Sequence, residues 1–150
     1  MRLVIQRVSE ANVTINHREK RFIEKGLMIL IGITHDDTSE DVNWLVQKVS
    51  KLRIFADAEG IMNLGINEVN GSILLISQFT LHASTKKGNR PSYIAAARPE
   101  MAIPLYKEFI EALQKEIINP IITGEFGADM QVQLINDGPV TILMDSKNKE

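Results

Sequence analysis

The stretch Leu27-Met28-Ile29-Leu30-Ile31-Gly32-Ile33 is the longest strongly apolar run in the 150-residue chain. It is far shorter than the roughly 18 residues that a membrane-spanning helix needs, and it matches the length of a strand. A strand that is apolar on both faces is typical of the centre of a sheet whose two sides are covered. We therefore predict that residues 27–33 form a central, buried strand.

Two segments further along the chain carry apolar residues at helical spacing. The first starts at Thr38 or Ser39, either of which can cap a helix, and its pattern predicts about 13 helical residues. The second starts near Pro99, which suits a first helical position, or near Pro104, which can also mark the first turn. The apolar stripes are Val42, Leu45, Val46, Val49 and Leu52 in the first helix, and Ile103, Tyr106, Phe109, Ile110, Leu113 and Ile117 in the second.

Strand patterns account for most of the remaining chain. Leu3–Ile15 alternates loosely between apolar and polar residues and predicts a long strand or a strand pair, and Ser72–Phe79 predicts a second buried strand. Three further strands are predicted at residues 121–123, 130–135 and 140–144. Asp137-Gly138-Pro139 is rich in turn formers, so we predict a hairpin turn between the last two strands.

The order of these elements indicates a fold class. Strands outnumber helices, and groups of strands separate the two helices. We therefore expect one domain over residues 1–150, of the α+β class, in which a mixed, largely antiparallel sheet curls toward a barrel and two main helices pack on one face. The polar residues 145–150 are expected to form a frayed tail.

Composition restricts the class of protein. With 44% hydrophobic and 24% charged residues, the chain is typical of soluble globular domains, and its charged N-terminal segment does not read as a signal peptide. The absence of cysteine excludes a disulfide and a thiolate nucleophile and favours a reducing compartment, so we expect a cytoplasmic protein. The three histidines show no metal-ligand spacing, and no P-loop, G-x-S-x-G or G-x-G-x-x-G motif occurs.

Charge is distributed unevenly along the chain. The net charge is only −2, yet no Asp or Glu occurs between Glu68 and Glu100. That window holds four cations and no anion, which is a formal charge of +4, from Lys86, Lys87, Arg90 and Arg98. Clustered cations suit a phosphate-bearing partner, although a solvated basic loop would have the same composition.

The segment Ser77-Gln78-Phe79-Thr80-Leu81 lies at the end of the second predicted buried strand. If it is extended, Gln78, Thr80 and His82 point to one face, where His82 could act as a base for Thr80. Backbone N–H groups at such a strand end can stabilise an oxyanion, and they can equally be satisfied by neighbouring backbone. The residues alone leave both interpretations open.

This segment and a second one together resemble a known family. Ser77-Gln78-Phe79-Thr80-Leu81 and Asn136-Asp137-Gly138-Pro139-Val140-Thr141 are similar to the two signature motifs of the D-aminoacyl-tRNA deacylases, the family first described for D-tyrosyl-tRNA. The resemblance covers essentially the whole chain in the same order. Its further blocks are residues 6–8, 53–55, 62–64, 85–92 and 126–132.

The resemblance implies a proofreading hydrolase. Members cleave the ester that joins a D-amino acid to the terminal adenosine of tRNA, and they also remove glycine mischarged onto tRNA(Ala). They are homodimers without a metal or organic cofactor, in which the cis-bonded Gly138 and Pro139 would reach into the partner's active site and reject L-amino acids. The implied catalytic residues are Ser77, Gln78, Phe79 and Thr80, the further substrate-binding residues are Arg7 and Met130, and the tRNA-binding residues are Lys86, Lys87 and Arg90.

For the chemistry, the resemblance points to backbone N–H groups of Gln78, Phe79 and Thr80 as oxyanion donors. The attacking group is either the Thr80 hydroxyl or a water helped by the terminal 2′-OH of tRNA, and we favour water because Thr80 has no assured base. Two other functions stay open: a catalytically idle RNA- or nucleotide-binding dimer, and an esterase for small acyl esters. The intact motif pair argues against the first, and the basic window argues against the second.

Overall fold

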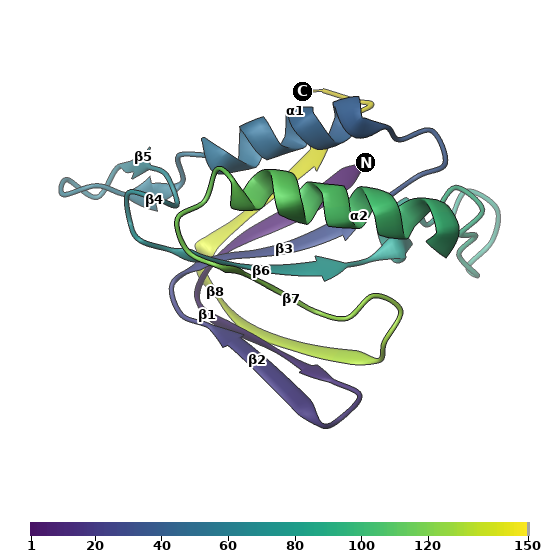
Figure 1. The fold of residues 1–150 in the computed structure, drawn as a ribbon, viewed down its shortest axis with the longest axis horizontal. Helices are drawn as coiled ribbons and strands as arrows, with labels where there is room; N and C mark the ends of the chain where they lie inside the picture. The colour runs from purple at the N-terminus through teal and green to yellow at the C-terminus, as the bar shows by residue number, and fades with distance from the viewer. Residues whose placement is uncertain (150) are drawn as a thin grey trace.

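A six-stranded sheet carries two helices on one of its faces (Figure 1). The structure is a computed structural model in which residues 1–149 are described. Within these residues, no helix is both long enough and apolar enough to cross a membrane. The elements are β1 (Arg2–Ile15), β2 (Glu19–Ile23), β3 (Gly26–Gly32), α1 (Ser39–Ser50), β4 (Phe55–Ala56), β5 (Met62–Leu64), β6 (Ser72–Ser77), the 3-10 helix η1 (Phe79–His82), α2 (Pro99–Gln114), β7 (Ile121–Thr123) and β8 (Met130–Asp145).

The main sheet is mixed. Its strand order is β2-β1-β3-β6-β7, and β8 pairs with β1 as well. The pairs that involve β1 are antiparallel, while β3, β6 and β7 run parallel to one another. Arg21 on β2 donates hydrogen bonds to the carbonyls of Thr123, at 2.6 Å, and Gly124, at 3.3 Å. This contact brings β2 to the end of β7, so the sheet nearly closes into a barrel, and the predicted α+β class is confirmed.

Strand β3 is buried on both faces, as its apolar run predicts. Leu27, Ile29 and Ile31 belong to the core beneath the two helices, whereas Met28 belongs to a second core inside the curled sheet. Hydrophobic side chains on alternate faces therefore serve two separate clusters. A strand with apolar residues at consecutive positions provides side chains to both clusters.

Helix α1 begins where the sequence predicts. Thr38 is its N-cap and forms a capping box with Asp41: the Thr38 N–H donates to the Asp41 carboxylate at 2.8 Å. Burial works to raise the pKa of Asp41, but hydrogen bonds with Ser146, Lys147 and the Thr38 backbone outweigh it and hold that pKa well below its usual range. Helix α2 begins at Pro99 and contains Pro104, so of the two prolines Pro99 is the first helical residue. Leu52 and Ile117, predicted as the last residues of the two stripes, lie just beyond the helices.

The chain does not stay extended through the first motif. β6 ends at Ser77, and Phe79–His82 forms η1, whose i→i+3 hydrogen bond from the Leu81 N–H to the Gln78 carbonyl measures 3.3 Å. Gly32 explains the close packing of η1 over the end of β3, because a Cβ there would lie 2.9 Å from the Leu81 Cβ. The prediction that Gln78, Thr80 and His82 share one face of a strand is therefore wrong.

The second motif is a bulge and not a hairpin turn. Residues 130–135 and 140–144 are two parts of the single strand β8, and both pair with β1. Gln6 pairs with Thr141 and Val8 with Asn136, so residues 137–140 stand opposite Arg7 alone. A hairpin would pair the two halves with each other, whereas here β1 holds both and the extra residues protrude. The Gly138–Pro139 peptide bond is cis, and Gly138 has a φ of +134°.

The segment after β8 is anchored at its start. The Ser146 N–H donates to the Met1 carbonyl at 2.9 Å, and the Met1 amino group donates to the Ser146 hydroxyl and to Asp37. Lys147 forms an ion pair with Asp41 at 2.9 Å. The expectation that residues 145–150 form a frayed tail is therefore wrong for Ser146 and Lys147. Glu150 lies outside the described residues.

Candidate active site

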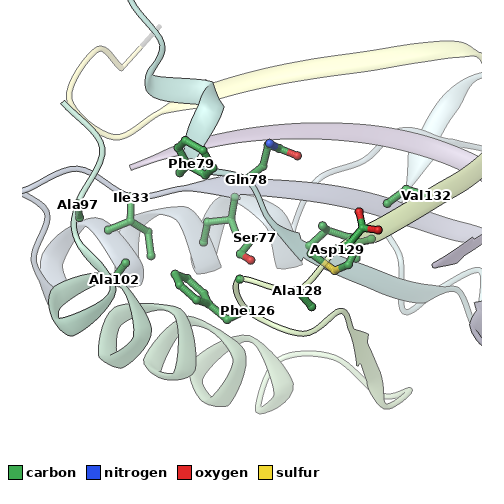
Figure 2. A pocket seen from close by; sticks show the side chains of 14 residues that line it. Ile33, Ser77, Gln78, Phe79, Ala97, Ala102, Phe126, Ala128, Asp129 and Val132 are labelled. Atoms are coloured by element: carbon green, nitrogen blue, oxygen red, sulfur yellow. The ribbon is translucent and has the colours of Figure 1, made fainter. Parts of the chain in front are cut away.

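A cavity of about 340 Å³ opens at the carboxyl ends of the parallel strands β3 and β6 (Figure 2). Such strand ends are a common place for ligands in sheets with parallel strands. The end of β3 supplies apolar wall residues, and α2 closes one side through Ala102. Ser77, Gln78 and Phe79 of the first motif also line the cavity, and Figure 2 shows Ser77 beside Phe126. The structure thus brings most of the first motif to a single concave site.

Two backbone N–H groups at the start of η1 have no partner among residues 1–149: that of Phe79, which lines the cavity, and that of Thr80, which follows it and does not line the cavity. The N–H of Gln78 is not one of them, because it donates to the Ile31 carbonyl at 2.7 Å; its expected role as an oxyanion donor is therefore wrong. Phe79 and Thr80 are the first residues of η1, and the first N–H groups of a helix have no acceptor within the helix. Among residues 1–149, no hydrogen bond uses either of these two N–H groups. They are available to an anionic oxygen.

Within residues 1–149, no carboxylate or imidazole forms a hydrogen bond with the Thr80 hydroxyl. Its hydroxyl accepts a hydrogen bond from the Gln78 side-chain amide at 2.6 Å. His82 is buried within η1 and does not line the cavity, and within residues 1–149 its Nε2 has no hydrogen-bond partner. Burial lowers the pKa of His82, and a hydrogen bond with the Gly32 backbone only partly offsets this. His82 therefore stays neutral at pH 7, apart from the cavity.

The loop between β7 and β8 forms another wall of the cavity. Phe126, Ala128 and Met130 line it, and only Met130 is a predicted site residue. Gly124 makes room for Met130, because a Cβ on Gly124 would overlap the Met130 sulfur. The Phe126 ring packs 5.9 Å from the ring of Tyr106. Phe126 and Ala128 stand in a block that carries the family resemblance, which is the one signal in the sequence that could have identified them.

One carboxylate, that of Asp129, lies among the residues that line the cavity. This carboxylate lies 2.8 Å from Nε2 of His17. Within residues 1–149, no three His, Asp or Glu side chains gather closely enough to hold a metal ion.

The second motif lies apart from the cavity of its own chain. Gly138 and Pro139 are exposed on the bulge, and neither they nor Arg7 line the cavity. Arg7 holds the bulge from below: its Nε donates to the Asp137 carbonyl at 3.0 Å, and its Nη1 donates to the Ile54 carbonyl at 2.6 Å. The protrusion is thus fixed in place while its tip faces solvent.

The three predicted tRNA-binding residues stand on one loop. Lys86, Lys87 and Arg90 are all exposed on loop 84–92, which follows η1. Two backbone hydrogen bonds between Ser84 and Ser92, of 2.8 and 2.9 Å, close the base of the loop. Loop 84–92 is therefore an exposed cationic loop that follows the motif lining the cavity.

Comparisons with known proteins identify relatives over the full length. The sequence model of the family described as D-Tyr-tRNA(Tyr) deacylase matches residues 4–145. Proteins named D-aminoacyl-tRNA deacylase from Flavobacterium johnsoniae and Bacteroides fragilis are 57% and 61% identical to this chain, with 100% of both chains covered in each case.

Two solved structures share the fold. One is named c-Myc DNA Unwinding Element Binding Protein and has a TM-score of 0.90 at 39% identity, covering 97% of this chain and 98% of its own. The other, described as a probable eukaryotic D-amino acid tRNA deacylase, has a TM-score of 0.81 at 18% identity, covering 95% and 97%. At that lower identity the likeness concerns the fold alone.

Proposed function

Because this chain belongs to the D-Tyr-tRNA(Tyr) deacylase family, we propose that it hydrolyses the ester bond of D-aminoacyl-tRNA and spares L-aminoacyl-tRNA. The products are tRNA and a free D-amino acid, so the reaction is a chirality proofreading step of translation in the cytoplasm. The observation that carries the proposal is that, among residues 1–149, the N–H groups of Phe79 and Thr80 have no partner at the start of η1, where Phe79 lines a cavity. An ester hydrolase needs such donors where the carbonyl oxygen becomes negative.

The reaction needs little else from the protein. The oxygen of a water attacks the ester carbonyl carbon, and the carbonyl oxygen becomes an oxyanion that accepts hydrogen bonds from Phe79 and Thr80. The bond from the carbonyl carbon to the ribose 3′-oxygen then breaks, and the 3′-oxygen takes the proton that the attacking water gives up. Removing one oxyanion donor typically costs on the order of 100-fold or more in rate.

Water is the attacking group in this proposal. The Thr80 hydroxyl already accepts a hydrogen bond from Gln78, and His82, buried outside the cavity, does not activate it. A hydroxyl without a base is a weak nucleophile. The 2′-OH of the terminal adenosine lies next to the ester and can take part in the proton transfer, so the substrate supplies the group that the protein lacks.

Rejection of L-amino acids is assigned to Gly138 and Pro139. In a homodimer, the partner's Gly138 and the partner's Pro139 enter the cavity, where their carbonyls hold the substrate ammonium group. They also occupy the space into which an L side chain would project, which is steric exclusion. Glycine has no side chain to exclude, so we propose that glycyl-tRNA(Ala) is also a substrate.

The position of the bulge and the edge of the sheet support this dimer. Gly138 and Pro139 lie outside the cavity of their own chain, on a bulge that Arg7 braces. Among the described residues, β8 pairs only with β1, so its outer edge is open along a 16-residue strand. An open edge with exposed apolar side chains favours association. Such side chains on β8 are Val132, Ile135 and Leu143.

The cations of loop 84–92 are assigned to the acceptor-stem phosphates. The loop begins two residues after η1 and exposes three cations, Lys86, Lys87 and Arg90. Phosphate contacts position a nucleic acid on a protein and supply much of its affinity. The loop therefore holds the stem while the 3′ end enters the cavity.

Deacylation of matched substrates tests the function. The protein is incubated with D-tyrosyl-tRNA and, separately, with L-tyrosyl-tRNA, and the remaining ester is followed over time. We expect rapid loss of the D form only. No loss of either form would support the idle RNA-binding dimer instead, and equal loss of both would remove the role of Gly138 and Pro139 in selection.

A further inference from the structure

Two aromatic side chains form an exposed pair beside the cavity. The rings of Phe79 and Tyr93 are 5.1 Å apart between centroids, with an angle of 74° between their planes. The pair is edge-to-face, and both side chains are open to solvent, with 55% of Phe79 and 41% of Tyr93 exposed. Packing of the protein's own core does not need rings in this position. Their exposure points to a partner that offers an apolar face.

The location of the pair suggests what that partner is. Phe79 lines the cavity, and Tyr93 is the residue directly after the Ser84–Ser92 closure of the cationic loop. The ring pair therefore connects the lining of the cavity with the base of the loop that carries the three cations. A single-stranded nucleic acid that runs from the loop to the cavity passes the base of the loop, where Tyr93 lies. Proteins bind such strands through basic surfaces combined with aromatic rings on which bases stack.

We propose that Tyr93, supported by Phe79, stacks against the base of the nucleotide that precedes the esterified adenosine at the 3′ end of tRNA. This inference rests on the proposed function. Because the ester has to reach the N–H groups of Phe79 and Thr80, the nucleoside that carries it enters the cavity. Its 5′-phosphate then leads outward in the direction of the cations, and the next base meets the exposed Tyr93 ring.

The inference predicts which property of Tyr93 matters. Stacking needs the aromatic ring and not the hydroxyl, and no hydrogen bond among residues 1–149 uses the Tyr93 hydroxyl. Tyr93→Ala is expected to lower kcat/KM for D-tyrosyl-tRNA by about 5- to 150-fold, the range that removal of a base-stacking ring produces. Tyr93→Phe is expected to stay within about twofold of the unchanged protein, because it retains the stacking ring.

The test compares two substrates on the same proteins. D-tyrosyl-tRNA carries the preceding nucleotide, whereas D-tyrosyl-adenosine, esterified at its ribose, lacks it. We expect Tyr93→Ala to slow only the first. An equal loss on both substrates would overturn the inference, because Tyr93 would then act inside the cavity or through the fold. Phe22→Ala removes an exposed ring on β2 and serves as the control for ring removal in general.

A second arm changes the substrate, so its main comparison is made on the unchanged protein. A D-tyrosyl-tRNA whose penultimate nucleotide lacks its base is offered to the unchanged protein, and we expect the same 5- to 150-fold loss. On this substrate Tyr93→Ala should cause no further loss, because the ring has no base left to contact. Full activity on the abasic tRNA would refute the inference while leaving the deacylase function intact. Inactivity of the unchanged protein on both intact substrates would instead refute the function itself.

Discussion

Two variants that each inactivate the site are predicted to restore activity when they are mixed. Ala128→Trp places an indole in the cavity, which Ala128 lines. Gly138→Ala disturbs the bulge, because Gly138 has a φ of +134° and a new Cβ would lie 2.8 Å from Val140 Cγ2 and 3.0 Å from Arg7 Nη2. In the Ala128→Trp homodimer both cavities are blocked, and in the Gly138→Ala homodimer both bulges are disturbed. A mixed dimer contains one subunit with an intact cavity that faces the intact bulge of the other.

The size of the recovery follows from counting. Random exchange of subunits in a twofold dimer makes about half of the dimers mixed, and each mixed dimer has one intact site out of two. Deacylation of D-tyrosyl-tRNA should therefore rise from near zero to about a quarter of the rate of the same amount of unchanged protein. If the bulge served the cavity of its own chain, no combination of these subunits would hold an intact site.

The assay co-expresses the two variants with different affinity tags and isolates dimers that carry both, in which the expected rate is about half that of the unchanged protein because one site of two is intact. Gly60→Ala is the matched control for Gly138→Ala, because Gly60 also has a positive φ, of +81°, while a Cβ there meets nothing within 4 Å. Mixed with Ala128→Trp, it should also restore activity, and alone it should remain active. Isolated mixed dimers as inactive as either parent would refute the exchange of the bulge between subunits. A protein that stays monomeric and fully active would refute the dimer itself.

Three further results are expected. Thr80→Ala should keep kcat within about tenfold of the unchanged protein, whereas kcat on tRNA ending in 2′-deoxyadenosine should fall about 100-fold or more. Single-turnover rates that fall more with Thr80→Ala than with the deoxy substrate would make Thr80 the nucleophile. The slope of log affinity for tRNA against log salt concentration should become smaller in magnitude by about two to three when Gln replaces Lys86, Lys87 and Arg90. An unchanged slope in filter binding would show that the phosphates bind elsewhere on the protein. Asp41→Asn should lower the free energy of unfolding at pH 7 by about 1–2 kcal/mol, because it weakens the capping box. Since the pKa of Asp41 is depressed in the folded state, urea titrations should show this difference in full above about pH 4 and a smaller one as the pH falls further.

Elements set by local patterns were predictable from the sequence. The run 27–33 needed only its apolar residues to identify a strand buried on two faces, and Thr38 needed only its neighbours to begin α1. Pro99 likewise begins α2. In each case the deciding interaction lies within a few residues of the chain, so the residues themselves carry the information.

Features set by distant partners were not predictable in this way. The change from β6 to η1 after Ser77 depends on the space over Gly32, 45 positions earlier. The bulge at 137–140 depends on β1, because only its pairing with β8 shows that two apparent strands are one. Turn-forming residues fit a hairpin and a bulge equally well. Local propensity therefore predicted correctly that the strand is interrupted at residues 137–139, but it predicted wrongly that the two halves pair with each other.

The same distinction explains why the chemistry is hard to find in the sequence. The proposed oxyanion donors are the backbone N–H groups of Phe79 and Thr80, and every residue except proline carries such a group. Their availability comes from the start of η1, while the neighbouring N–H of Gln78 is already bound to Ile31. Side-chain type therefore identifies neither the two donors nor the one that is occupied. For this kind of site the path of the backbone is the functional feature, and motif residues matter because they keep that path.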